Sequence, residues 1–561
     1  MDIKYTKNTP AEELANIFIR NLNKEDIIAE IFNFFEYSPI ARCNEDPGKI
    51  DNPIKDFIDS DYSDVNTLVK IINIVKKGSE NSEKQEKELV EKVKSYQLAH
   101  LTEDTNLETM AKDLHVSYHY ICHIFKVQTG MSINTYKNRK RVEMAIKLLS
   151  TTELKIAEIS SACGFNNTSY FAEVFTRFTG FAPKSFKDIL KSKKLLDFYT
   201  LEDILLLTKM ESFEFLSGDM KLINEEAFTV TDVNNPDEQS SFLHETAIIE
   251  FKNTIYTSWY QSPEAELMGY TPVVGKRSFD GGITFTEKEI IAEAEDKTDK
   301  LLYCPPVYGI DEGKLYMFIN EMVAPDHIHA LNLYVLDEKS GKFKFLWSRP
   351  IPFKLNTNVV KLSNGKLILP GRIGEIDSFP NTPALLISDS GRIDSEWRLI
   401  KIAENGDLPD GTQLIHPELS LIENDGTLYI FSRNDMRHVP LLYISKDFGE
   451  SFTKVMAHDI PYVGTKIYAG TLTDGRNYVI CNTDKLDRSK ISVYFSEKGS
   501  IKFNKQLILF DEKNENLENV TACHYPAAVE YKNKLYIIAT KNFDTFIKRG
   551  AVLFTVDLNK I

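Results

Sequence analysis

Polar and ionisable residues recur at two matched positions in the C-terminal part of the chain, and their types suit an anionic or polyhydroxylated ligand. Six segments of similar pattern stand roughly 50 to 60 residues apart, and each ends in a Leu-Tyr-like pair. The first residues of these segments are His244, Cys304, Asn356, His416, Lys466 and His524. Four residues beyond the pairs stand Tyr260, Asn320, Arg372, Arg433, Asn482 and Thr540.

The elements that must bring these residues together are short β-strands. From about residue 211 onward, Val, Ile, Tyr, Phe and Thr alternate with polar residues, and turns of the NG, DG and SG type recur. Each repeat has room for four strands, so the sequence predicts a six-bladed β-propeller over residues 221–561. If each segment is an innermost strand and its return, both sets of residues lie at one mouth of the central channel. We expect a ligand site there, which also includes Tyr525.

Two turns carry an independent mark of this fold. SFDGGITF and SKDFGESF both fit the Asp-box pattern S-x-D-x-G-x-S/T-F/W. We expect Asp280 and Asp447 in these turns to cap their own hairpins by accepting hydrogen bonds from backbone N–H groups. With these turns and repeats, residues 221–561 resemble the sialidase/BNR-repeat propellers.

The resemblance raises the question of hydrolytic activity. A sialidase needs an arginine triad, a Tyr/Glu nucleophile pair and an acidic group as acid/base. Arg372 and Arg433 could supply two arginines, and Tyr525 with Glu418 or Glu245 could imitate the pair. However, the sequence has no Arg-Ile-Pro motif at the start of the propeller and no acid placed as that family places it, and glycoside hydrolysis needs both carboxylate roles at a fixed spacing.

We therefore expect a propeller that binds a carbohydrate or sugar acid, with no catalytic residue, cofactor or metal ion assigned. The alternative is an intracellular sialidase-like glycoside hydrolase that carries a DNA-binding domain.

A second pattern occurs twice within residues 107–186, about fifty residues apart. In each copy a short amphipathic helix ends in a tight turn, and a second helix with apolar residues at i, i+3 and i+4 stops at Gly130 or Gly180. The segment INTYKNRKRVEMAIKLLS between the copies reads as one helix, roughly 25 Å long, which could hold two recognition helices near the ~34 Å spacing of successive major grooves. Two helix-turn-helix units in one short domain are typical of DNA binding.

Residues 96–190 resemble the DNA-binding domain of the AraC/XylS family of bacterial transcription regulators. The resemblance rests on LKIAEISSACGFNNTSYFAEVFTRFTGFAPKSF and, in the first copy, on VSYHYICHIFKVQTGMSINTY. It implies promoter DNA as a partner. The candidate contact residues lie on the exposed faces of the recognition helices and among nearby basic side chains: Tyr118, His119, Cys122, His123, Lys126, Arg139, Lys140, Thr168, Ser169, Ala172, Glu173 and Lys184. Lys137, Arg141 and Lys187 could also meet phosphates.

Two positions depart from that family. At His123 it usually presents Arg, and at Glu173 an Arg or a similar residue is common. Arginine reads guanine bidentately for about 1 to 3 kcal/mol per pair, whereas glutamate can only accept a hydrogen bond. We therefore expect modest, salt-sensitive affinity per monomer, with dimerisation or a ligand needed for useful occupancy.

Composition limits the remaining possibilities. The chain of 561 residues is 42% hydrophobic and 27% charged, with a formal net charge of −15, so it suits a globular protein of several domains and not an indiscriminate nucleic-acid binder. Its six cysteines are scattered without a CxxC pair, which favours reduced thiols. The first residues lack an apolar signal core, and no apolar run approaches the roughly 20 residues of a membrane span. We expect a cytoplasmic protein with no membrane partner.

The predicted order is an all-α, helix-turn-helix half followed by an all-β propeller. Residues 1–95 read as an acidic helical region, with residues 78–85 as a solvated joint before another helix. This region could be a packing or dimerisation module or a small-ligand sensor. Residues 191–220 read as a helical linker. The whole reads as a sequence-specific transcription regulator whose propeller senses a carbohydrate or sugar acid. A homodimer is a candidate assembly, since useful occupancy of DNA would need a second copy or a ligand.

Overall fold

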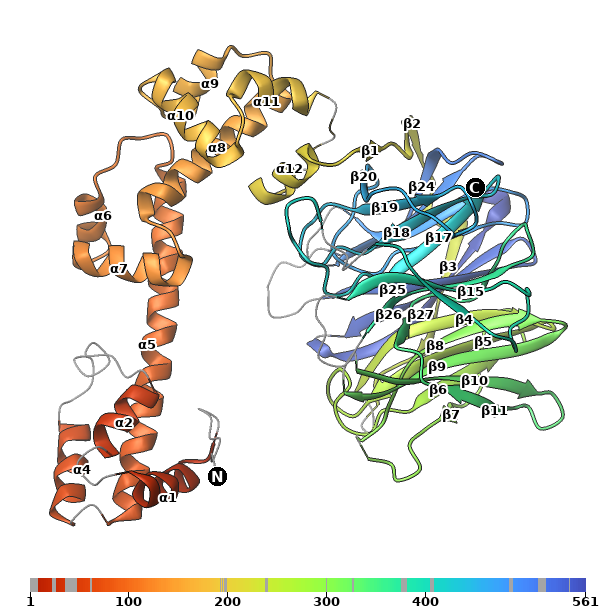
Figure 1. Cartoon of the computed structure of the whole chain (residues 1–561), viewed down its shortest axis with the longest axis horizontal. Helices are drawn as coiled ribbons and strands as arrows, with labels where there is room; N and C mark the ends of the chain where they lie inside the picture. The colour runs from red at the N-terminus through yellow and green to blue at the C-terminus, as the bar shows by residue number, and fades with distance from the viewer. Residues whose placement is uncertain are drawn as a thin grey trace. The chain divides into compact units, whose positions relative to one another are not determined.

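The computed structural model describes residues 9–22, 27–35, 48–60, 63–191, 193, 195, 199–237, 241–298, 300–324, 327–374, 381–403, 408–483, 488–512, 521–543 and 545–561 (Figure 1). The chain divides into two compact units, Met1–Asp188 and Ile189–Ile561. The first is helical and the second consists mainly of β-strands. Among the described residues, no helix combines the length and the apolar character needed to cross a membrane.

The first unit begins with a small helical bundle. Its helices are α1 (Ala11–Asn21), α2 (Ile27–Phe34), α4 (Gly48–Asp59) and the long α5 (Val65–Ala99). They bury an apolar core that includes Leu14, Phe18, Phe57, Leu68 and Ile72. The role of this bundle as a packing or dimerisation module or as a small-ligand sensor stays a prediction.

Helix α5 is continuous through residues 78–85, so the expected joint there is wrong. Its N-terminal half packs into the bundle through Leu68 and Ile72. Its C-terminal half packs through Val90 and Val93 against the next helices. Because both ends are held by packing, the roughly 1 kcal/mol that Gly78 costs inside a helix does not break it.

The next six helices that the structure describes contain two successive helix-turn-helix units, as predicted. The helices are α6 (Leu107–Asp113), α7 (Tyr118–Thr129), α8 (Ile133–Thr151), α9 (Ile156–Ala162), α10 (Thr168–Thr179) and α11 (Pro183–Leu190). The two units are α6 with α7, and α9 with α10. Ser117 and Asn167 cap the two recognition helices α7 and α10, and Gly130 and Gly180 end them in the left-handed conformation. Helix α8 is the predicted connecting helix.

The second unit is a six-bladed propeller, which confirms the predicted fold. The consecutive strands of each blade pair antiparallel, and the first strands of neighbouring blades lie next to one another around a ring. Blades 1 to 3 are formed by β4 (Phe242–Phe251), β5 (Thr254–Ser262), β6 (Val273–Ser278) and β7 (Glu289–Ala292); β8 (Leu302–Asp311), β9 (Lys314–Ala324), β10 (His327–Asp337) and β11 (Lys342–Arg349); and β12 (Phe353–Leu355), β13 (Val360–Lys361), β14 (Leu367–Ile373), β15 (Thr382–Ser388) and β16 (Arg398–Lys401). Blades 4 to 6 are formed by β17 (Leu419–Asn424), β18 (Thr427–Ser432), β19 (Leu441–Ser445) and β20 (Met456–His458); β21 (Tyr468–Thr471), β22 (Asn477–Asn482), β23 (Lys490–Ser496) and β24 (Phe503–Asp511); and β25 (Cys523–Tyr531), β26 (Lys534–Phe543) and β27 (Thr545–Asp557).

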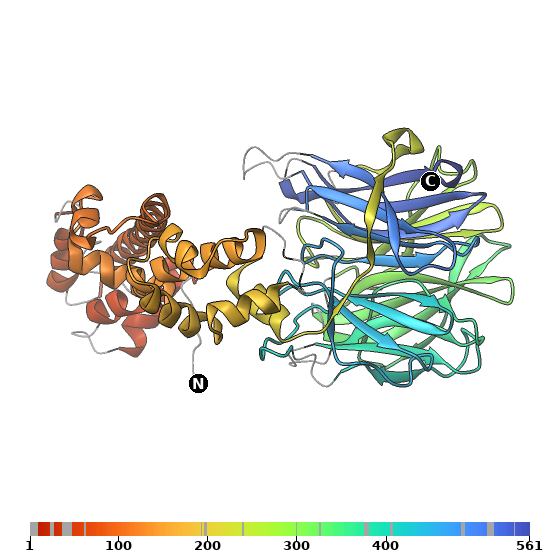
Figure 2. The same cartoon turned by 90° about the horizontal axis from the view of Figure 1, so that it is seen from above.

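The segment that precedes blade 1 is part of the propeller. After helix α12 (Leu201–Thr208), strand β1 (Ser212–Phe213) pairs parallel with β20, and β2 (Leu216–Leu222) pairs parallel with β24. Strand β3 (Phe228–Asn234) then pairs antiparallel with β27 and completes blade 6. The chain therefore crosses the outer edges of blades 4, 5 and 6 in turn, visible in Figure 2 as the yellow segment outside the blue blades.

Both Asp-box turns have the predicted structure. Asp280 Oδ1 accepts hydrogen bonds from the backbone N–H groups of Ile283 (3.1 Å) and Thr284 (2.9 Å). Asp447 accepts equivalent bonds from Glu450 (3.2 Å) and Ser451 (2.9 Å). The hydrogen bonds from Thr284 and Ser451 lower the pKa of each aspartate to about 2. Their role is therefore to hold the hairpins, as expected.

Candidate functional site

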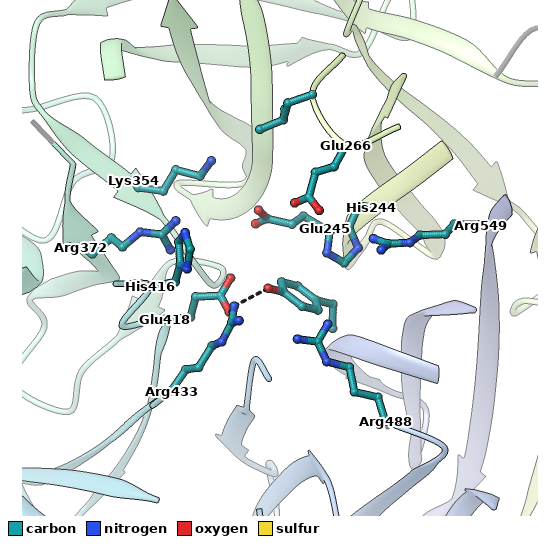
Figure 3. Close-up of a pocket in the computed structure, with 12 residues that line it drawn as sticks. His244, Glu245, Glu266, Lys354, Arg372, His416, Glu418, Arg433, Arg488 and Arg549 are labelled. Carbon is teal, nitrogen blue, oxygen red and sulfur yellow. Dashed lines mark hydrogen bonds and ion pairs between the residues drawn. The ribbon is translucent and has the colours of Figure 1, made fainter. Parts of the chain in front are cut away.

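A cavity of about 320 Å³ lies in the propeller, where residues from all blades but the second line it (Figure 3). Its lining residues are His244, Glu245, Glu266, Leu267, Lys354, Arg372, His416, Glu418, Arg433, Arg488, Tyr525 and Arg549. The size is at the lower end of the range for small-molecule sites, roughly 300 to 1,000 Å³.

Two β-bulges shape the cavity wall. Successive residues of a regular strand point to opposite faces, yet the neighbours His244 and Glu245 both line the cavity. The register of β4 shifts after His244, and Glu245 adopts φ of 49°. The innermost strand of blade 6 has the same shift, and Tyr525 there adopts φ of 56°. Left-handed backbone at a non-glycine residue costs of order 1 to 3 kcal/mol and persists where the surrounding structure enforces it, often at functional sites.

Positive charge dominates the lining. Five side chains are basic: Lys354, Arg372, Arg433, Arg488 and Arg549. Three are carboxylates: Glu245, Glu266 and Glu418. Since charges are costly to bury without partners, the excess of cations favours an anionic ligand.

Arg433 connects two other lining residues. Its Nη1 donates to Glu418 Oε2 (2.9 Å) and to Tyr525 Oη (2.7 Å) (Figure 3). Burial alone raises the pKa of Glu418, but Arg433, Arg372 and Lys466 together outweigh it and hold that pKa below its usual value. Burial raises the pKa of Tyr525 well above its usual value, so its phenol is neutral. Among the described residues, the buried Nε of Arg433 has no hydrogen-bond partner.

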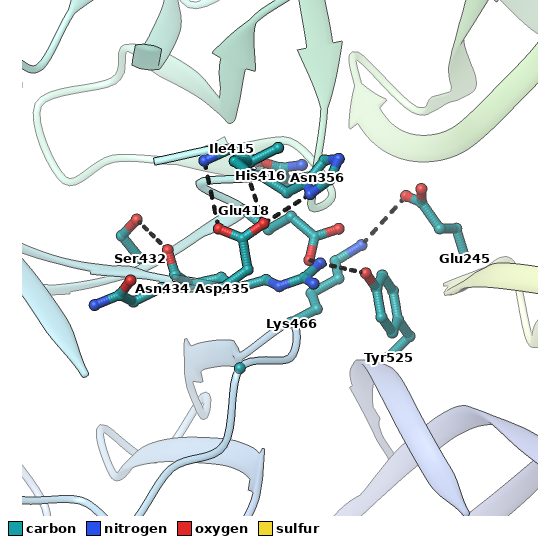
Figure 4. Close-up of polar contacts among 12 residues, drawn as sticks. Glu245, Asn356, Ile415, His416, Glu418, Ser432, Asn434, Asp435, Lys466 and Tyr525 are labelled. Atoms are coloured by element: carbon teal, nitrogen blue, oxygen red, sulfur yellow. Dashed lines mark hydrogen bonds and ion pairs between the residues drawn. The ribbon is translucent and has the colours of Figure 1, made fainter. Parts of the chain in front are cut away.

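Glu245 has the opposite character to Glu418. Burial raises its pKa although Lys354 and Lys466 oppose the shift. Lys466 Nζ lies 4.0 Å from Glu245 Oε2 (Figure 4). Cys304 Sγ donates weakly to Glu245 Oε1 at 3.7 Å. The cavity therefore holds one carboxylate that stays ionised and one that takes up a proton more readily and can then donate to a ligand oxygen.

His416 is held by Asp435. Its Nδ1 donates to Asp435 Oδ2 at 2.7 Å (Figure 4). Burial alone raises the pKa of Asp435, but His416 and Arg433 lower it to about 2. The ionised carboxylate fixes the orientation of the imidazole at the cavity wall.

His244 lies on the opposite side of the cavity. Its ring centroid is 4.1 Å from that of Tyr525, and its Nδ1 is 3.3 Å from Thr540 Oγ1. Burial, together with the nearby Arg549, lowers its pKa well below the usual value. His244 is therefore a neutral hydrogen-bonding group in this site.

Five of the predicted ligand-binding residues line the cavity: His244, Arg372, His416, Arg433 and Tyr525. Three others brace that wall from behind. Tyr260 Oη donates to Glu266 (3.4 Å), Lys466 faces Glu245, and His524 Nε2 lies 3.1 Å from Asn542 Oδ1. Whether any of them touches a ligand stays a prediction.

The three predicted asparagines join neighbouring blades. Asn320 Nδ2 donates to the Phe353 carbonyl at 2.7 Å, from blade 2 to blade 3. The Leu419 backbone N–H in blade 4 donates to Asn356 Oδ1 at 2.9 Å. Asn482 Nδ2 donates to the carbonyl of Cys523 at 2.8 Å, from blade 5 to blade 6. These buried amides satisfy strand ends, so their position in the repeat has a structural explanation.

Sequence reasoning missed five lining residues. They are Glu266, Leu267, Lys354, Arg488 and Arg549. Lys354 could have been found from the sequence, because it stands two residues before Asn356, the first residue of an aligned repeat segment. The others come from the connection after β5, the connection after β22 and strand β27, which the repeat alignment did not cover.

The predicted DNA-contact residues lie mainly on exposed faces of the helix-turn-helix helices. On α7, Tyr118, His119, His123 and Lys126 are exposed and Cys122 is half-buried. On α10, Thr168, Ser169 and Glu173 are exposed and Ala172 is half-buried, and Lys184 is exposed at the start of α11. Their contact with DNA stays a prediction.

Several basic residues of this unit make internal bonds. Arg139 and Lys140 both pair with Glu143 on α8, at 3.2 and 2.7 Å. On α10, Arg177 Nη2 pairs with Glu173 Oε1 at 2.6 Å.

Two more cations of α8 hold the segment before α6. Lys137 Nζ donates to the Glu103 carbonyl and to Thr105 Oγ1, both at 2.7 Å. Arg141 Nε donates to the Leu101 carbonyl at 2.8 Å. These side chains therefore serve the fold of the unit, whatever else they contact.

Within the described residues, no group of three or more His, Cys, Asp or Glu side chains is arranged to hold a metal ion. Within the same described residues, Cys122, Cys163, Cys304, Cys481 and Cys523 form no disulfide bond.

Comparison with known proteins matches both units. A BNR repeat-like domain model matches residues 260–537, and a helix-turn-helix domain model matches residues 110–188. The regulatory protein PocR of Salmonella typhimurium is 34% identical over 98 residues, 18% of this chain and 32% of PocR. The HTH-type transcriptional activator RhaR of Escherichia coli (strain K12) is 34% identical over 105 residues, 19% of this chain and 37% of RhaR. This chain thus spans about a third of the length of these relatives.

Among solved structures, the NanB sialidase from Streptococcus pneumoniae is similar with a TM-score of 0.46 and 12% identity, over 60% of this chain and 71% of that chain. The family matches agree with the two helix-turn-helix units and the six blades described above. The chain therefore combines two helix-turn-helix units that match a helix-turn-helix domain model with a six-bladed propeller that matches a BNR repeat-like domain model.

Proposed function

We propose that this protein is a DNA-binding transcription regulator and that its propeller binds an anionic carbohydrate, such as a sugar acid, as the effector. One observation carries the effector half: five cationic side chains converge on a cavity that holds three carboxylates. The DNA half is supported by two capped recognition helices with exposed polar faces. It is also supported by likeness in this domain to PocR and RhaR, by name a regulatory protein and a transcriptional activator.

The cavity offers groups for both parts of a sugar acid. An arginine guanidinium donates two parallel hydrogen bonds to a carboxylate, and Arg372, Arg488 and Arg549 reach the cavity from different blades. Glu266 can accept hydrogen bonds from ligand hydroxyls, and neutral His244 can donate or accept. The cavity volume of about 320 Å³ suits one such unit.

The arrangement favours binding over hydrolysis. Tyr525 and Glu418 are both hydrogen-bonded to Arg433, so the two groups that could imitate a nucleophile pair are joined through a cation. A neutral phenol that accepts a hydrogen bond from arginine is a poor nucleophile.

The DNA grip of one chain is limited by its own charge pairing. Glu173 lies on the exposed face of α10 and engages Arg177, so this helix presents no unopposed arginine at that point. We infer that two copies bind DNA together, because a dimer doubles the phosphate and base contacts.

A thermal-shift screen of the full-length protein tests the effector. All three tryptophans, Trp259, Trp347 and Trp397, lie in the propeller, so their fluorescence reports unfolding of this unit alone. The ligands are N-acetylneuraminic, glucuronic and galacturonic acids, with glucose and galactose as neutral controls. We expect an acid to raise the melting temperature, since a ligand at 100 times its Kd adds about 2.7 kcal/mol to stability.

Matched variants locate the binding. Arg549→Ala should lose the shift, whereas Arg398→Ala, a half-exposed side chain paired with Asp389 and Glu450 outside the cavity, should keep it. If no acid stabilises the protein more than the neutral sugars do, the effector proposal is wrong. Turnover of fluorogenic glycosides that Arg372→Ala abolishes would instead favour an enzyme.

Selection of duplexes from a random pool, followed by gel shifts with and without the best ligand, tests the DNA half. We expect a selected sequence whose affinity changes when the ligand is added. Failure to enrich any sequence would contradict sequence-specific binding.

A further inference from the structure

Helix α12 is docked on the propeller through one buried carboxylate. Asp203 is 1% exposed, and its Oδ1 accepts from the His438 backbone N–H at 2.9 Å. Its Oδ2 accepts from His438 Nδ1 at 2.8 Å and from the backbone N–H of Thr200 at 2.8 Å. Asp203 therefore caps α12 and binds the propeller with the same group.

Apolar contacts support the same docking. Leu206 and Leu207 of α12, with Met210 after it, share a buried cluster with residues of the propeller. The propeller members are Leu408, Leu414, Val439, Leu441 and Ala457. Two segments of blade 4 thus contact α12: residues 408–414 before β17, and residues 437–441 at the start of β19.

These two segments also reach the cavity. Residues 408–414 lead directly to His416, and residues 437–441 follow Arg433 and Asp435. The hydrogen bond from His416 to Asp435 joins the two segments at the cavity wall (Figure 4). Arg437 Nε, 3.5 Å from Asp410 Oδ2, joins them again on the side of α12.

The connection between β18 and β19, residues 433–439, is internally braced. Asn434 is fully buried, and its Oδ1 accepts from the backbone N–H of Arg437 at 3.0 Å. Its Nδ2 donates to the Val439 carbonyl at 3.0 Å, and its backbone N–H donates to Tyr462 Oη. Because these hydrogen bonds make the connection rigid, we expect it to move as one segment. A shift of Arg433 or Asp435 would then also move His438 and Val439.

We propose that residues 433–439 couple ligand binding in the cavity to the docking of α12, and thereby to the segment that follows the DNA-binding unit in the chain. The proposal rests on the proposed function, in which the cavity binds an effector. A ligand anion that binds Arg433 and His416 competes with Glu418, Tyr525 and Asp435 for their hydrogen bonds. The ligand changes α12 only if it binds the docked and released states with different affinity.

The first test needs no ligand. Amide hydrogen exchange of α12 is measured in the full-length protein for His416→Ala, His438→Ala and the double variant. His416→Ala should speed exchange in α12 by roughly 5-fold or more, the lower end of usual coupling strengths. The effect should shrink in the His438→Ala background, because the contact that transmits it is gone.

Two controls keep this test decisive. His244→Ala alters the cavity on the side of blade 1 and should leave α12 exchange unchanged. Asp203→Asn should speed α12 exchange without changing the tryptophan fluorescence of the propeller, which shows that the blades remain folded. Equal α12 exchange in His416→Ala and wild type overturns the proposal, whatever the ligand screen gives.

The second test uses the sugar acids named above as probes. If N-acetylneuraminic or glucuronic acid stabilises the propeller, it should change both α12 exchange and DNA affinity in the wild type, and only the propeller stability in His438→Ala. A probe that alters DNA affinity equally in both proteins overturns the coupling and leaves the proposed function intact. If no probe stabilises the propeller, the effector proposal fails, and the exchange measurements alone decide the coupling.

Discussion

The two units use their basic residues in opposite ways. In the helix-turn-helix domain, Lys137 and Arg141 bind backbone carbonyls, and Arg177 is paired with Glu173. In the propeller, by contrast, basic side chains outnumber carboxylates in one cavity. Net charge along the sequence therefore says little about where an anion binds. The number of cations left over after internal pairing is the better guide.

The largest effect on stability should follow from removing the Arg433 side chain. Its removal leaves the carboxylate of Glu418, 2% exposed, as a buried charge beside the neutral phenol of Tyr525. Breaking a buried ion pair in this way costs about 3 to 5 kcal/mol. Arg433→Ala should therefore lower the free energy of unfolding of the propeller by that order, measured by tryptophan fluorescence in urea. Arg433→Met combined with Glu418→Leu should recover most of the loss. If Arg433→Ala alone is as stable as wild type, the cavity does not depend on this pair.

The next effect concerns Arg141 in the helix-turn-helix domain. Its Nε and Nη2 donate to the carbonyls of Leu101 and Glu103, and charged hydrogen bonds contribute about 1.5 to 3 kcal/mol. Arg141→Ala should destabilise the helical unit, seen by far-UV circular dichroism, and weaken DNA binding without altering its salt dependence. Lys126→Ala, at an exposed position, should reduce the salt slope by about 1 and leave stability unchanged. The reverse pattern would mean that Arg141 meets phosphate and Lys126 does not.

A smaller effect is expected from releasing Arg177. The Glu173–Arg177 pair is exposed, so its contribution to stability is about 0 to 1 kcal/mol. Glu173→Gln should hardly change unfolding, but it removes a negative charge from the face of α10 and frees the arginine. DNA affinity in gel shifts should rise several-fold, and it should return to the wild-type value in Glu173→Gln with Arg177→Ala. Unchanged affinity in the single variant would place this face away from DNA.

The smallest effect concerns the pH dependence of the contact between His438 and Asp203, because His438, unlike the arginines above, loses its charge in mildly alkaline buffer. Hydrogen bonding to Asp203 raises the pKa of His438 above 6.5. Burial alone raises the pKa of Asp203, but the bonds from His438 and Thr200 lower it below 3.8. The contribution of His438 is thus complete below pH 6.5 and is lost as pH rises through its raised pKa, whereas that of Asp203 is lost in acid below pH 3.8. Protection of α12 in hydrogen exchange, corrected for intrinsic rates, should fall in mildly alkaline buffer, and His438→Ala should remove this dependence.

The repeat pattern predicted the blades because side-chain alternation and turn residues are local properties. Arg372, Arg433 and His416, which it predicted at one mouth of the channel, line the cavity because those positions recur at the ends of strands, and their contact with a ligand stays a prediction. It could not distinguish them from Asn320, Asn356 and Asn482, since an amide at the same position joins two blades.

The β-bulges at Glu245 and Tyr525 explain why the sequence pattern alone did not place both residues in the cavity wall. Glu245 and Tyr525 line the cavity because left-handed backbone turns them inward, and ordinary strand alternation points such neighbours away. Arg488 and Arg549 lie outside the aligned segments, so no repeat marks them. In the helical unit, caps and glycines predicted the helices well, but the continuity of α5 depends on packing at both ends.

The strands that lie along the outer edges of blades 4 to 6 also bear on biosynthesis. Strand β3 closes blade 6 by pairing with β27, so the ring is complete only after β27 (Thr545–Asp557) has left the ribosome. The helix-turn-helix units lie entirely upstream and are made of local contacts, which form early during synthesis. A translation product that stops before blade 6 would therefore carry folded helix-turn-helix units without a closed propeller.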